Sequence, residues 1–283
     1  MPYHPDPIAL LGVFIAAVAA GAFGAMLGLG GGIILIPALT VIFDVPIKEA
    51  IAASLVSVVA TSTSAAVVYV EKHLVNIRLG MTLEVATSIG ALLGGYYVVR
   101  VSPEALRVLF AGLLAYTAYN MARKAGQEAA TTDETYVHVP ADATKDQLDD
   151  HVNNGRVPYT IKHLEAGMAA SLVAGGISGL LGVGGGIIKV PVMRLAMGVP
   201  MRVAIATSNF MIGVTAATSA LIYYSRGMIS LYITAPAALG VLLGAQIGTR
   251  VSRRVNVRAL TWLFVVMMIV TGIQMIIRAI EGG

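Results

Sequence analysis

A glycine-rich decapeptide occurs twice in this chain, each time inside long apolar sequence. The copies are Gly28-Leu-Gly-Gly-Gly-Ile-Ile-Leu-Ile-Pro37 and Gly182-Val-Gly-Gly-Gly-Ile-Ile-Lys-Val-Pro191, 154 positions apart (182 minus 28), with seven of ten residues identical. Three consecutive glycines interrupt a helix, and interrupted backbone persists within a bilayer only where protein or a water-filled cavity satisfies its N–H and C=O groups. Paired breaks in corresponding halves of a membrane chain indicate a transport site.

Composition excludes a soluble protein, because 57% of the residues are hydrophobic, 12% are charged and the mean hydropathy is +0.81. The formal net charge of +4 does not require a nucleic-acid partner, since basic residues that flank membrane spans explain the excess. The chain has no cysteine, so neither disulfides nor thiolate metal sites are available, and the redox compartment is left open. The sequence therefore predicts a multi-pass protein of the lipid bilayer.

Apolar segments of about 18 to 23 residues are long enough to cross a hydrocarbon core as helices. They lie at 8–26, 49–70, 80–99, 104–122, 164–181, 202–224, 229–249 and 258–278. The residues before the first segment lack the basic stretch of a secretory signal, so we expect that segment to be retained. Two shorter pieces, 33–43 and 187–197, follow the glycine runs and reach only about 16 Å as helices. We interpret them as half-helices.

The duplication extends beyond the glycines in one ungapped register. Ser54 falls on Ser208, Tyr69 on Tyr223, and Arg100 on Arg254. Residues 1–123 are therefore interpreted as a first transmembrane repeat and 163–283 as a second. Between them, 124–162 forms a polar loop with little apolar periodicity. Its seven acidic residues are Glu128, Asp133, Glu134, Asp142, Asp146, Asp149 and Asp150.

The distribution of basic residues bears on how the two repeats are oriented. If the glycine-broken element crosses the membrane once, nine Lys and Arg lie on each side, with Lys189 set aside inside the membrane. If that element is re-entrant, or crosses twice, thirteen lie on the face of 124–162 and five lie opposite, namely Lys48, Arg100, Arg107, Arg226 and Arg278. Because cytoplasmic loops carry the excess of Lys and Arg, we predict an inverted repeat with a cytoplasmic 124–162 loop and both termini outside.

Inversion gives the glycine runs a chemical role. Each run lies at the amino end of a half-helix, where N–H groups lack partners and the helix dipole is positive. Two such ends that approach the membrane midplane would bind an anion through backbone donors, predicted at Gly30, Gly31, Gly32 and at Gly184, Gly185, Gly186. The alternative is that the glycines only allow tight helix packing, as the small-residue faces around Gly90, Gly94, Gly244 and Gly248 would.

Polar residues inside the apolar helices are mostly hydroxyls and amides, which can donate to an oxyanion. We predict substrate contacts from Ser54, Thr207, Ser208 and Asn209; the alternative for each is an ordinary interhelical hydrogen bond. Lys189 is the basic residue within an apolar segment, and its repeat partner is Leu35. It is expected either to provide the countercharge for an anionic substrate or to extend to the cytoplasmic interface. Glu84 and Glu165 lie near predicted helix starts and are expected to be interfacial.

Catalytic and cofactor motifs are absent from the sequence. It contains no Walker-type phosphate loop, no His-Glu-x-x-His or paired carboxylates for a metal, and no Gly-x-Ser-x-Gly nucleophile. The Gly-x-Gly-Gly-Gly run follows a membrane helix and lacks the spacing of a dinucleotide site. We therefore expect neither an enzyme nor a cofactor or metal site.

The chain resembles the sulfite exporter TauE/SafE family of membrane permeases. The resemblance rests on the paired Gly-x-Gly-Gly-Gly-x-x-x-x-Pro elements at 28–37 and 182–191 and on the matching segments Ala52-Ala53-Ser54 and Ala206-Thr207-Ser208, the second followed by Asn209. It covers nearly the whole chain apart from 124–162. It implies movement of sulfur-containing anions such as sulfite, thiosulfate or organosulfonates across the bacterial inner membrane, and it does not select one substrate.

The sequence thus predicts a secondary transporter that binds a small oxyanion between two repeats and exports it by alternating access. An anion channel is a rival interpretation. A second rival is a membrane scaffold or receptor that recruits a partner through 124–162. The small-residue faces could serve a homo-oligomer as well as the intramolecular interface. Export is expected from the resemblance, since several members of the family move their substrate outward, whereas the residues themselves leave the direction and the coupling ion open.

Overall fold

The computed structural model describes residues 7–27, 31–71, 73–127, 159, 161–251 and 257–281, and these ranges contain helices and turns but no strand. The helices are α1 (Pro7–Leu27), α2 (Gly32–Pro37), the π-helix η1 (Ala38–Ile42), α3 (Ile47–Glu71), α4 (Ile77–Tyr97), α5 (Pro103–Gln127), α6 (Leu164–Leu181), α7 (Gly186–Leu195), α8 (Met201–Ser225), α9 (Leu231–Val251) and α10 (Val257–Ile280). Every predicted apolar segment coincides with helix, so the all-helical fold class is confirmed. Most of the predicted 124–162 loop lies outside the described residues.

Six helices in the described ranges are long and apolar enough to cross a membrane: α3, α4, α6, α8, α9 and α10. A shorter apolar stretch, Ile8–Gly24, lies in α1, and another, Gly32–Ile42, covers α2 and η1. The α5 helix is not among the six; it carries Arg107 and Asn120 inside the span predicted at 104–122. Six spanning helices establish a multi-pass membrane protein.

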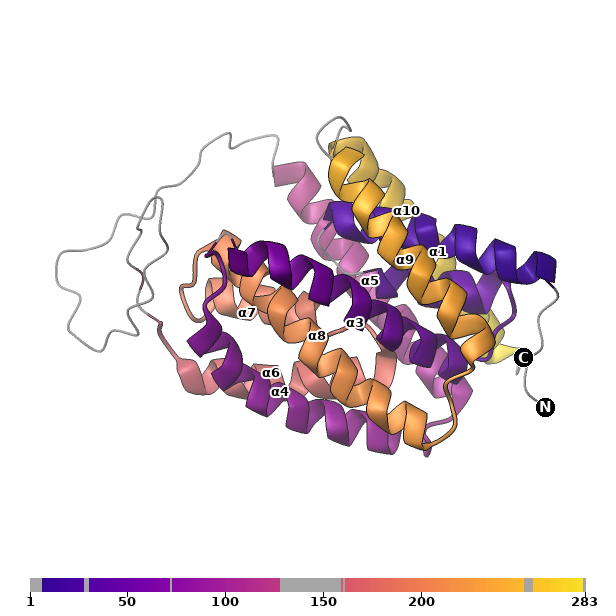
Figure 1. Cartoon of the computed structure of the whole chain (residues 1–283), viewed down its shortest axis with the longest axis horizontal. Coiled ribbons are helices and arrows are strands. Elements are labelled where there is room, and N and C mark those ends of the chain that lie inside the picture. Colours follow the sequence, from indigo (N-terminus) through magenta and orange to yellow (C-terminus); the bar gives the residue numbers. More distant parts are fainter. Residues whose placement is uncertain are drawn as a thin grey trace.

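Glycine contacts join two pairs of helices, and each pair links the two halves of the chain. In one pair α4 lies against α6, and a methyl group built on Gly90 would stand 2.0 Å from the carbonyl oxygen of Leu172. In the other pair α1 lies against α9 (Figure 1), and the same group on Gly244 would stand 2.0 Å from the carbonyl oxygen of Val18. Both contacts relate the same repeat positions, since 244 minus 90 and 172 minus 18 equal 154. The predicted small-residue packing is confirmed at these glycines.

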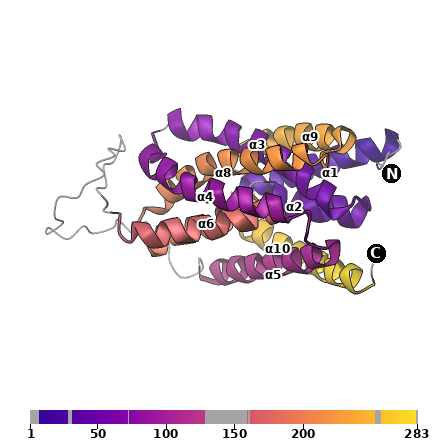
Figure 2. The ribbon, with the colours of Figure 1, turned by 90° about the horizontal axis from the view of Figure 1, so that it is seen from below.

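The remaining long helices pack against their own repeat partners, α3 against α8 and α5 against α10. Arg107, near the start of α5, donates a hydrogen bond to the carbonyl of Arg278 near the end of α10, at 3.3 Å. Asn76, just beyond the end of α3, donates its N–H to the hydroxyl of Thr207 near the start of α8, at 3.0 Å. Both pairs are therefore antiparallel. Figure 2 shows α5 and α10 side by side along the edge of the bundle.

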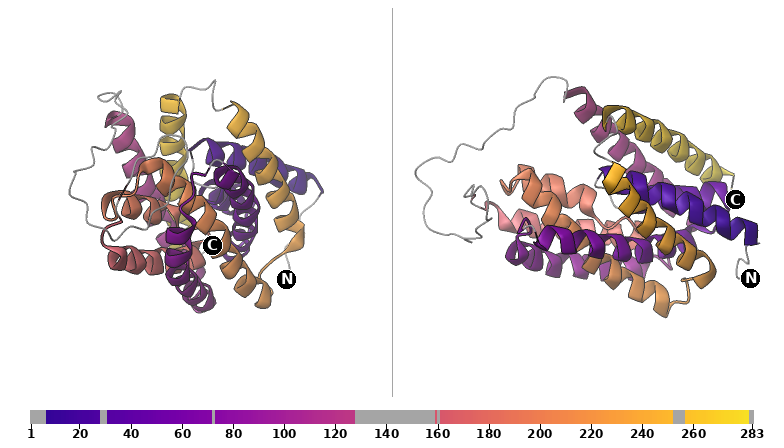
Figure 3. Two further views of the ribbon diagram at one scale, coloured as in Figure 1. Left: turned by 60° about the vertical axis from the view of Figure 1, so that its left-hand side comes forward. Right: turned by 45° about the horizontal axis from the view of Figure 1, so that its top comes forward.

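The bundle is elongated along its helices, and α1 begins at the same end at which α10 finishes (Figures 1 and 3). An even number of crossings would place both chain ends on one side of a membrane. The other end of the bundle holds the end of α5 and the start of α6. The 124–162 segment therefore connects elements at the end opposite to the two termini.

The first half-helix is continuous from Gly32 to Ile42, because the π-helix η1 follows α2 directly. Pro37 lies at the junction and lacks the N–H that an α-helical hydrogen bond needs. Arg278 at the end of α10 donates to the carbonyls of Thr40 and Val41 and pairs with Asp44. The carboxyl end of this half-helix is thereby fixed to the last helix of the second repeat.

Candidate functional site

The break in the second repeat is formed by glycines that adopt a conformation rare for other residues. Gly182, Gly184 and Gly185 have φ angles of 71°, 74° and 73°, in the left-handed region. Gly182 ends α6 by donating its N–H to the carbonyl of Ser178 at 2.8 Å. Gly185 then precedes α7, which begins at Gly186. The first N–H groups of α7 are thus presented in the interior of the protein, where a helix start attracts negative charge.

The two breaks meet at Ser54 of α3. Its hydroxyl donates to the carbonyl of Gly182 at 2.9 Å, which links the first repeat to the second. A methyl group on Gly32, the first residue of α2, would stand 2.6 Å from the Ser54 Oγ and 3.0 Å from the Gly182 carbonyl oxygen. Gly31 is buried beside them, and Gly30 lies outside the described residues. Ser54 therefore has a partner within the protein, which is the interhelical hydrogen bond expected as its alternative role.

Ser208 occupies the repeat position of Ser54 in α8 and has different surroundings. A methyl group on Gly186 would stand 3.3 Å from the Ser208 Oγ, which parallels the approach of Gly32 to Ser54. Ser208 is 2% exposed, and within the described residues its hydroxyl has no hydrogen-bond partner. A buried hydroxyl without a partner carries a desolvation cost of about 1–3 kcal/mol, which a bound acceptor or water would offset. Ser208 is thus poised to donate to a ligand.

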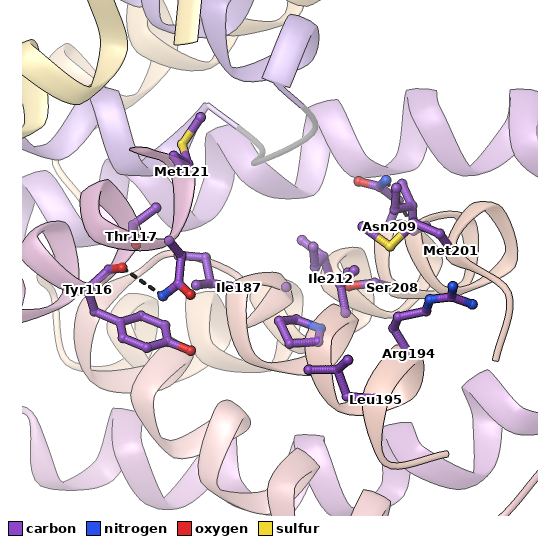
Figure 4. Close-up of a pocket in the computed structure, with 15 residues that line it drawn as sticks. Tyr116, Thr117, Met121, Ile187, Arg194, Leu195, Met201, Ser208, Asn209 and Ile212 are labelled. Atoms are coloured by element: carbon purple, nitrogen blue, oxygen red, sulfur yellow. Dashed lines mark hydrogen bonds between the residues drawn. The ribbon is translucent and has the colours of Figure 1, made fainter. Parts of the chain in front are cut away.

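A cavity of about 510 Å³ opens next to Ser208, between α5, α7 and α8. Gly186, Ser208 and Asn209 are the predicted site residues that line it. Figure 4 shows Arg194, Ser208 and Asn209 on one side of the cavity, Tyr116 and Thr117 on the other, and Ile187 between them. The cavity therefore has polar groups on two sides and an apolar middle, a common make-up of small-molecule sites.

The other predicted residues lie outside this lining. Thr207 points away and accepts the N–H of Asn76, as described above. The lining also omits Gly31, Gly32, Ser54, Gly184, Gly185 and Lys189. Some of the predicted site residues thus lie around the start of α7 and line the cavity. The others lie in the contact between the repeats or on the face of α7 that is turned away from the cavity.

Arg194 was missed as a site residue in the sequence. It lies in the last turn of α7 and shares a helical face with Ile187, Val190 and Pro191, all of which line the cavity. The signal that could have found it is the spacing of 187, 190, 191 and 194, which marks one face of a helix. Its guanidinium adds a permanent positive charge and several donors to the polar side of the cavity.

Lys189 lies on the opposite face of α7 and is 2% exposed. Its Nζ donates to the Thr215 Oγ1 at 2.9 Å and lies 3.6 Å from the Glu84 Oε2, and Thr215 lies 2.8 Å from the Glu84 Oε1. Lys189 therefore does not extend to the interface, and its partner within the protein is Glu84.

The expectation that Glu84 is interfacial is wrong, because this residue is 5% exposed. The sequence placed the start of the helix near residue 80, whereas α4 begins at Ile77 with Asn76 as its cap. The Asn76 side chain accepts the N–H of Leu79 at 2.8 Å. Glu84 consequently lies about two turns inside the helix rather than in the first turn.

A helix start, a free hydroxyl, an amide and a guanidinium around one cavity favour an anionic ligand over a cationic one. Together with the glycine-broken half-helices and the six spanning helices, they define a membrane protein of the transporter class. A family model described as "Sulfite exporter TauE/SafE" matches residues 13–275. The chain belongs to this family, and the resemblance noted in the sequence is confirmed.

Three curated relatives are similar to this chain, two of them over most of their own length. A probable membrane transporter protein of Bacillus subtilis, YunE, is 25% identical over 274 residues, which cover 94% of this chain and 97% of the relative. A probable membrane transporter protein of Methanocaldococcus jannaschii, MJ0441, is 24% identical over 86% of each chain. The probable membrane transporter protein MamO of Paramagnetospirillum magneticum is 25% identical over 94% of this chain and 44% of its own. No solved structure matches. The family and these relatives make the chain a membrane transporter.

Proposed function

We propose that this chain is a secondary transporter that carries a small sulfur-containing oxyanion, such as sulfite, thiosulfate or an organosulfonate, across the bacterial inner membrane by alternating access. The observation that supports it best is the buried hydroxyl of Ser208, without a partner among the described residues, beside the start of α7 in a cavity that Arg194 also lines. Tetrahedral and pyramidal oxyanions accept several hydrogen bonds at once. Backbone N–H groups, a hydroxyl and a guanidinium supply such donors.

In this proposal the two repeats are inverted. The antiparallel contacts between α5 and α10 and between α3 and α8 support this. Each of these pairs consists of a helix and its repeat partner. A two-fold axis that relates two antiparallel helices must be perpendicular to them. Such an axis would lie in the membrane plane. The division into repeats at 1–123 and 163–283 belongs to the same proposal. The α5, α7 and α8 helices around the cavity come from both repeats, which places the site at their interface.

The cavity belongs to the state that faces the cytoplasm. Asn120 and Met121 line it from the carboxyl half of α5, and Met201 lines it from the first turn of α8. The carboxyl half of α5 and the first turn of α8 both lie toward the end of the bundle at which 124–162 is attached, and this segment is expected in the cytoplasm. Loading an anion from that side is the first step of export.

Counterflow in proteoliposomes tests the proposal. Vesicles loaded with unlabelled sulfite, thiosulfate or 2-hydroxyethanesulfonate are diluted into a trace of the same labelled anion, and a carrier accumulates label transiently. With the membrane potential held at zero by valinomycin and equal potassium on both sides, a channel would equilibrate label without an overshoot, and a protein that does not transport would accumulate none. Either result in folded, reconstituted protein would contradict the carrier.

Ser208→Ala tests the site within the same assay. We expect the apparent affinity for the transported anion to fall about tenfold, because one charge-assisted hydrogen bond is lost. Ser219→Ala is the matched control, since Ser219 is equally buried in α8 but donates to the Thr215 carbonyl in its own helix. Equal effects of the two substitutions would remove Ser208 from the site.

A further inference from the structure

The buried group of Glu84, Thr215 and Lys189 has no role in the cavity described above. It joins three helices, since Glu84 lies in α4, Lys189 in α7 and Thr215 in α8. Both charged side chains are almost inaccessible, with 1% of Lys189 and 6% of Glu84 exposed. We propose that Glu84 and Lys189 form a proton-binding site that is coupled to the anion cavity, so that the transporter binds its anion together with a proton.

The positions related to these residues by the repeat show that the fold does not need the charges. The residues at the corresponding positions are Leu35, Thr61 and Ala238, since each differs by 154 from Lys189, Thr215 and Glu84. Leu35 is fully buried in α2, which packs on α3 as α7 packs on α8. A buried ion pair is on average no more stabilising than apolar residues in its place. Glu84 comes from the first repeat and Lys189 from the second, and the residues related to them by the repeat, Ala238 and Leu35, are uncharged. An intramembrane ion pair that is present at one of two related places and replaced by apolar residues at the other therefore points to function.

Glu84 is able to accept a proton without loss of its existing hydrogen bonds. Its Oε1 lies 2.8 Å from the Thr215 hydroxyl and accepts from Ser88 at 3.1 Å. Its Oε2 is buried, has no hydrogen bond within the described residues, and lies 3.6 Å from the Lys189 ammonium. A proton added to Oε2 would convert Glu84 into a neutral acid, while Lys189 keeps its own proton and its charge.

Few charged groups surround Glu84. Within the described residues, α7 contributes Lys189, α8 contributes the uncharged Thr215, and α4 itself contributes Ser88. The α6 helix contacts this part of α4 through glycine, with Gly175 against the Thr87 carbonyl. The pair is therefore neutral when Glu84 is ionised and carries one positive charge when Glu84 is protonated.

The half-helix α7 connects this charge to the cavity. A methyl group on Gly185 would stand 3.4 Å from the Lys189 Cε, so the lysine stem runs back along the start of the helix. The next residue, Gly186, lines the cavity. An anion held there lies within one helical turn of the pair, in a medium that screens charge far less than water does. It consequently favours the protonated, positively charged state of the pair.

Coupling of this kind is reciprocal: a bound anion promotes protonation of Glu84, and a protonated Glu84 strengthens anion binding by the same factor. We expect a factor of about ten, within the usual range for coupled sites. Each transport cycle would then move one proton with each anion. This inference rests on the proposed anion site in the cavity.

Isothermal titration of the purified, full-length protein with 2-hydroxyethanesulfonate tests the coupling, because this probe keeps the same charge across the pH range used. We expect its affinity to rise about tenfold from mildly alkaline to mildly acidic buffer. Proton uptake on binding, measured in buffers of different ionisation enthalpy, should accompany the rise. In Glu84→Gln, which mimics the protonated acid, affinity should stay at the high level at every pH, and binding should take up no proton.

The double variant Glu84→Ala/Lys189→Leu copies the repeat-related residues Ala238 and Leu35 and guards against misfolding. We expect it to fold, because the repeat-related place packs with these side chains, and to bind the probe at the low level at every pH. A wild-type affinity that does not change with pH, or a pH dependence that persists in either variant, would overturn the coupling and leave the anion site standing. Absence of probe binding to folded wild-type protein at any pH would overturn both.

Discussion

Thr215 and Thr61 occupy equivalent positions in the two repeats but have different partners. Thr215 contacts both members of a buried ion pair, at 2.9 Å from Lys189 and 2.8 Å from Glu84. Among the described residues, Thr61 donates to the Ser57 and Val58 carbonyls in its own helix and to no other group. The same threonine substitution can therefore be compared at two equivalent positions of the duplicated fold.

Thr215→Val should lower the free energy of unfolding by about 1–2 kcal/mol, because both charged groups lose a hydrogen-bond partner that water cannot replace. Thr61→Val should change it by about 0.5 kcal/mol or less, since the carbonyls of its helix keep their backbone donors. Thermal unfolding in detergent, calibrated with a denaturant, measures both. Equal losses in the two variants would show that the Lys189–Glu84 pair does not depend on Thr215.

At the residue scale the sequence singled out some of the polar residues that line the cavity and missed another. Ser208 and Asn209 were found because they are polar residues in an apolar helix next to the glycine break. Arg194 was missed because a basic residue near the end of an apolar segment is usually interfacial, and only the exact start of α7 shows that it faces inward. Glu84 was misplaced by an error of three residues in one helix start, which in an α-helix amounts to almost a full turn.

At the scale of single elements, glycine decides how closely helices approach. A methyl group on Gly90 would stand 2.0 Å from a backbone oxygen of α6, and backbone cannot move aside as a side chain can. Gly90→Ala should therefore separate α4 from α6 and destabilise the protein by about 1–3 kcal/mol. Gly112→Ala in α5 is the control: nothing lies within 4 Å of the added methyl group, and alanine is the better helix former by about 1 kcal/mol.

The two substitutions should thus shift the midpoint of thermal unfolding in opposite directions, downward for Gly90→Ala and upward or not at all for Gly112→Ala. A downward shift of the same size in both would mean that glycine matters for another reason than the α4–α6 contact.

The elements themselves were predictable because membrane helices are long and uniformly apolar. The half-helices were predictable because three glycines end one helix and leave too few apolar residues for another span. The π-helical turn after Pro37 left no comparable signal.

At the scale of the whole molecule, the sequence predicted two repeats but not how they interlock. The pairing of α4 with α6 and of α1 with α9 exchanges elements between the halves, so neither repeat packs its own first and fourth helices together. Only the glycines at 90, 94, 244 and 248 hinted at close contacts, and a small-residue face does not specify its partner. The cavity also lies between the two halves, because α5 comes from the first half of the chain and α7 and α8 come from the second.

Equivalent positions in the two repeats provide a direct test of inversion. Glu71 and Ser225 are exposed residues at the ends of α3 and α8 and differ by 154. Because these helices pack antiparallel, their ends should lie on opposite sides of the membrane. The chain has no cysteine, so Glu71→Cys and Ser225→Cys can each be the single thiol of the protein. In sealed cells a membrane-impermeant maleimide should label Ser225→Cys, on the outer side, and should label Glu71→Cys only after the membrane is permeabilised. Labelling of both thiols from one side would show parallel repeats, in which the starts of the two half-helices could not face each other from opposite sides of the membrane.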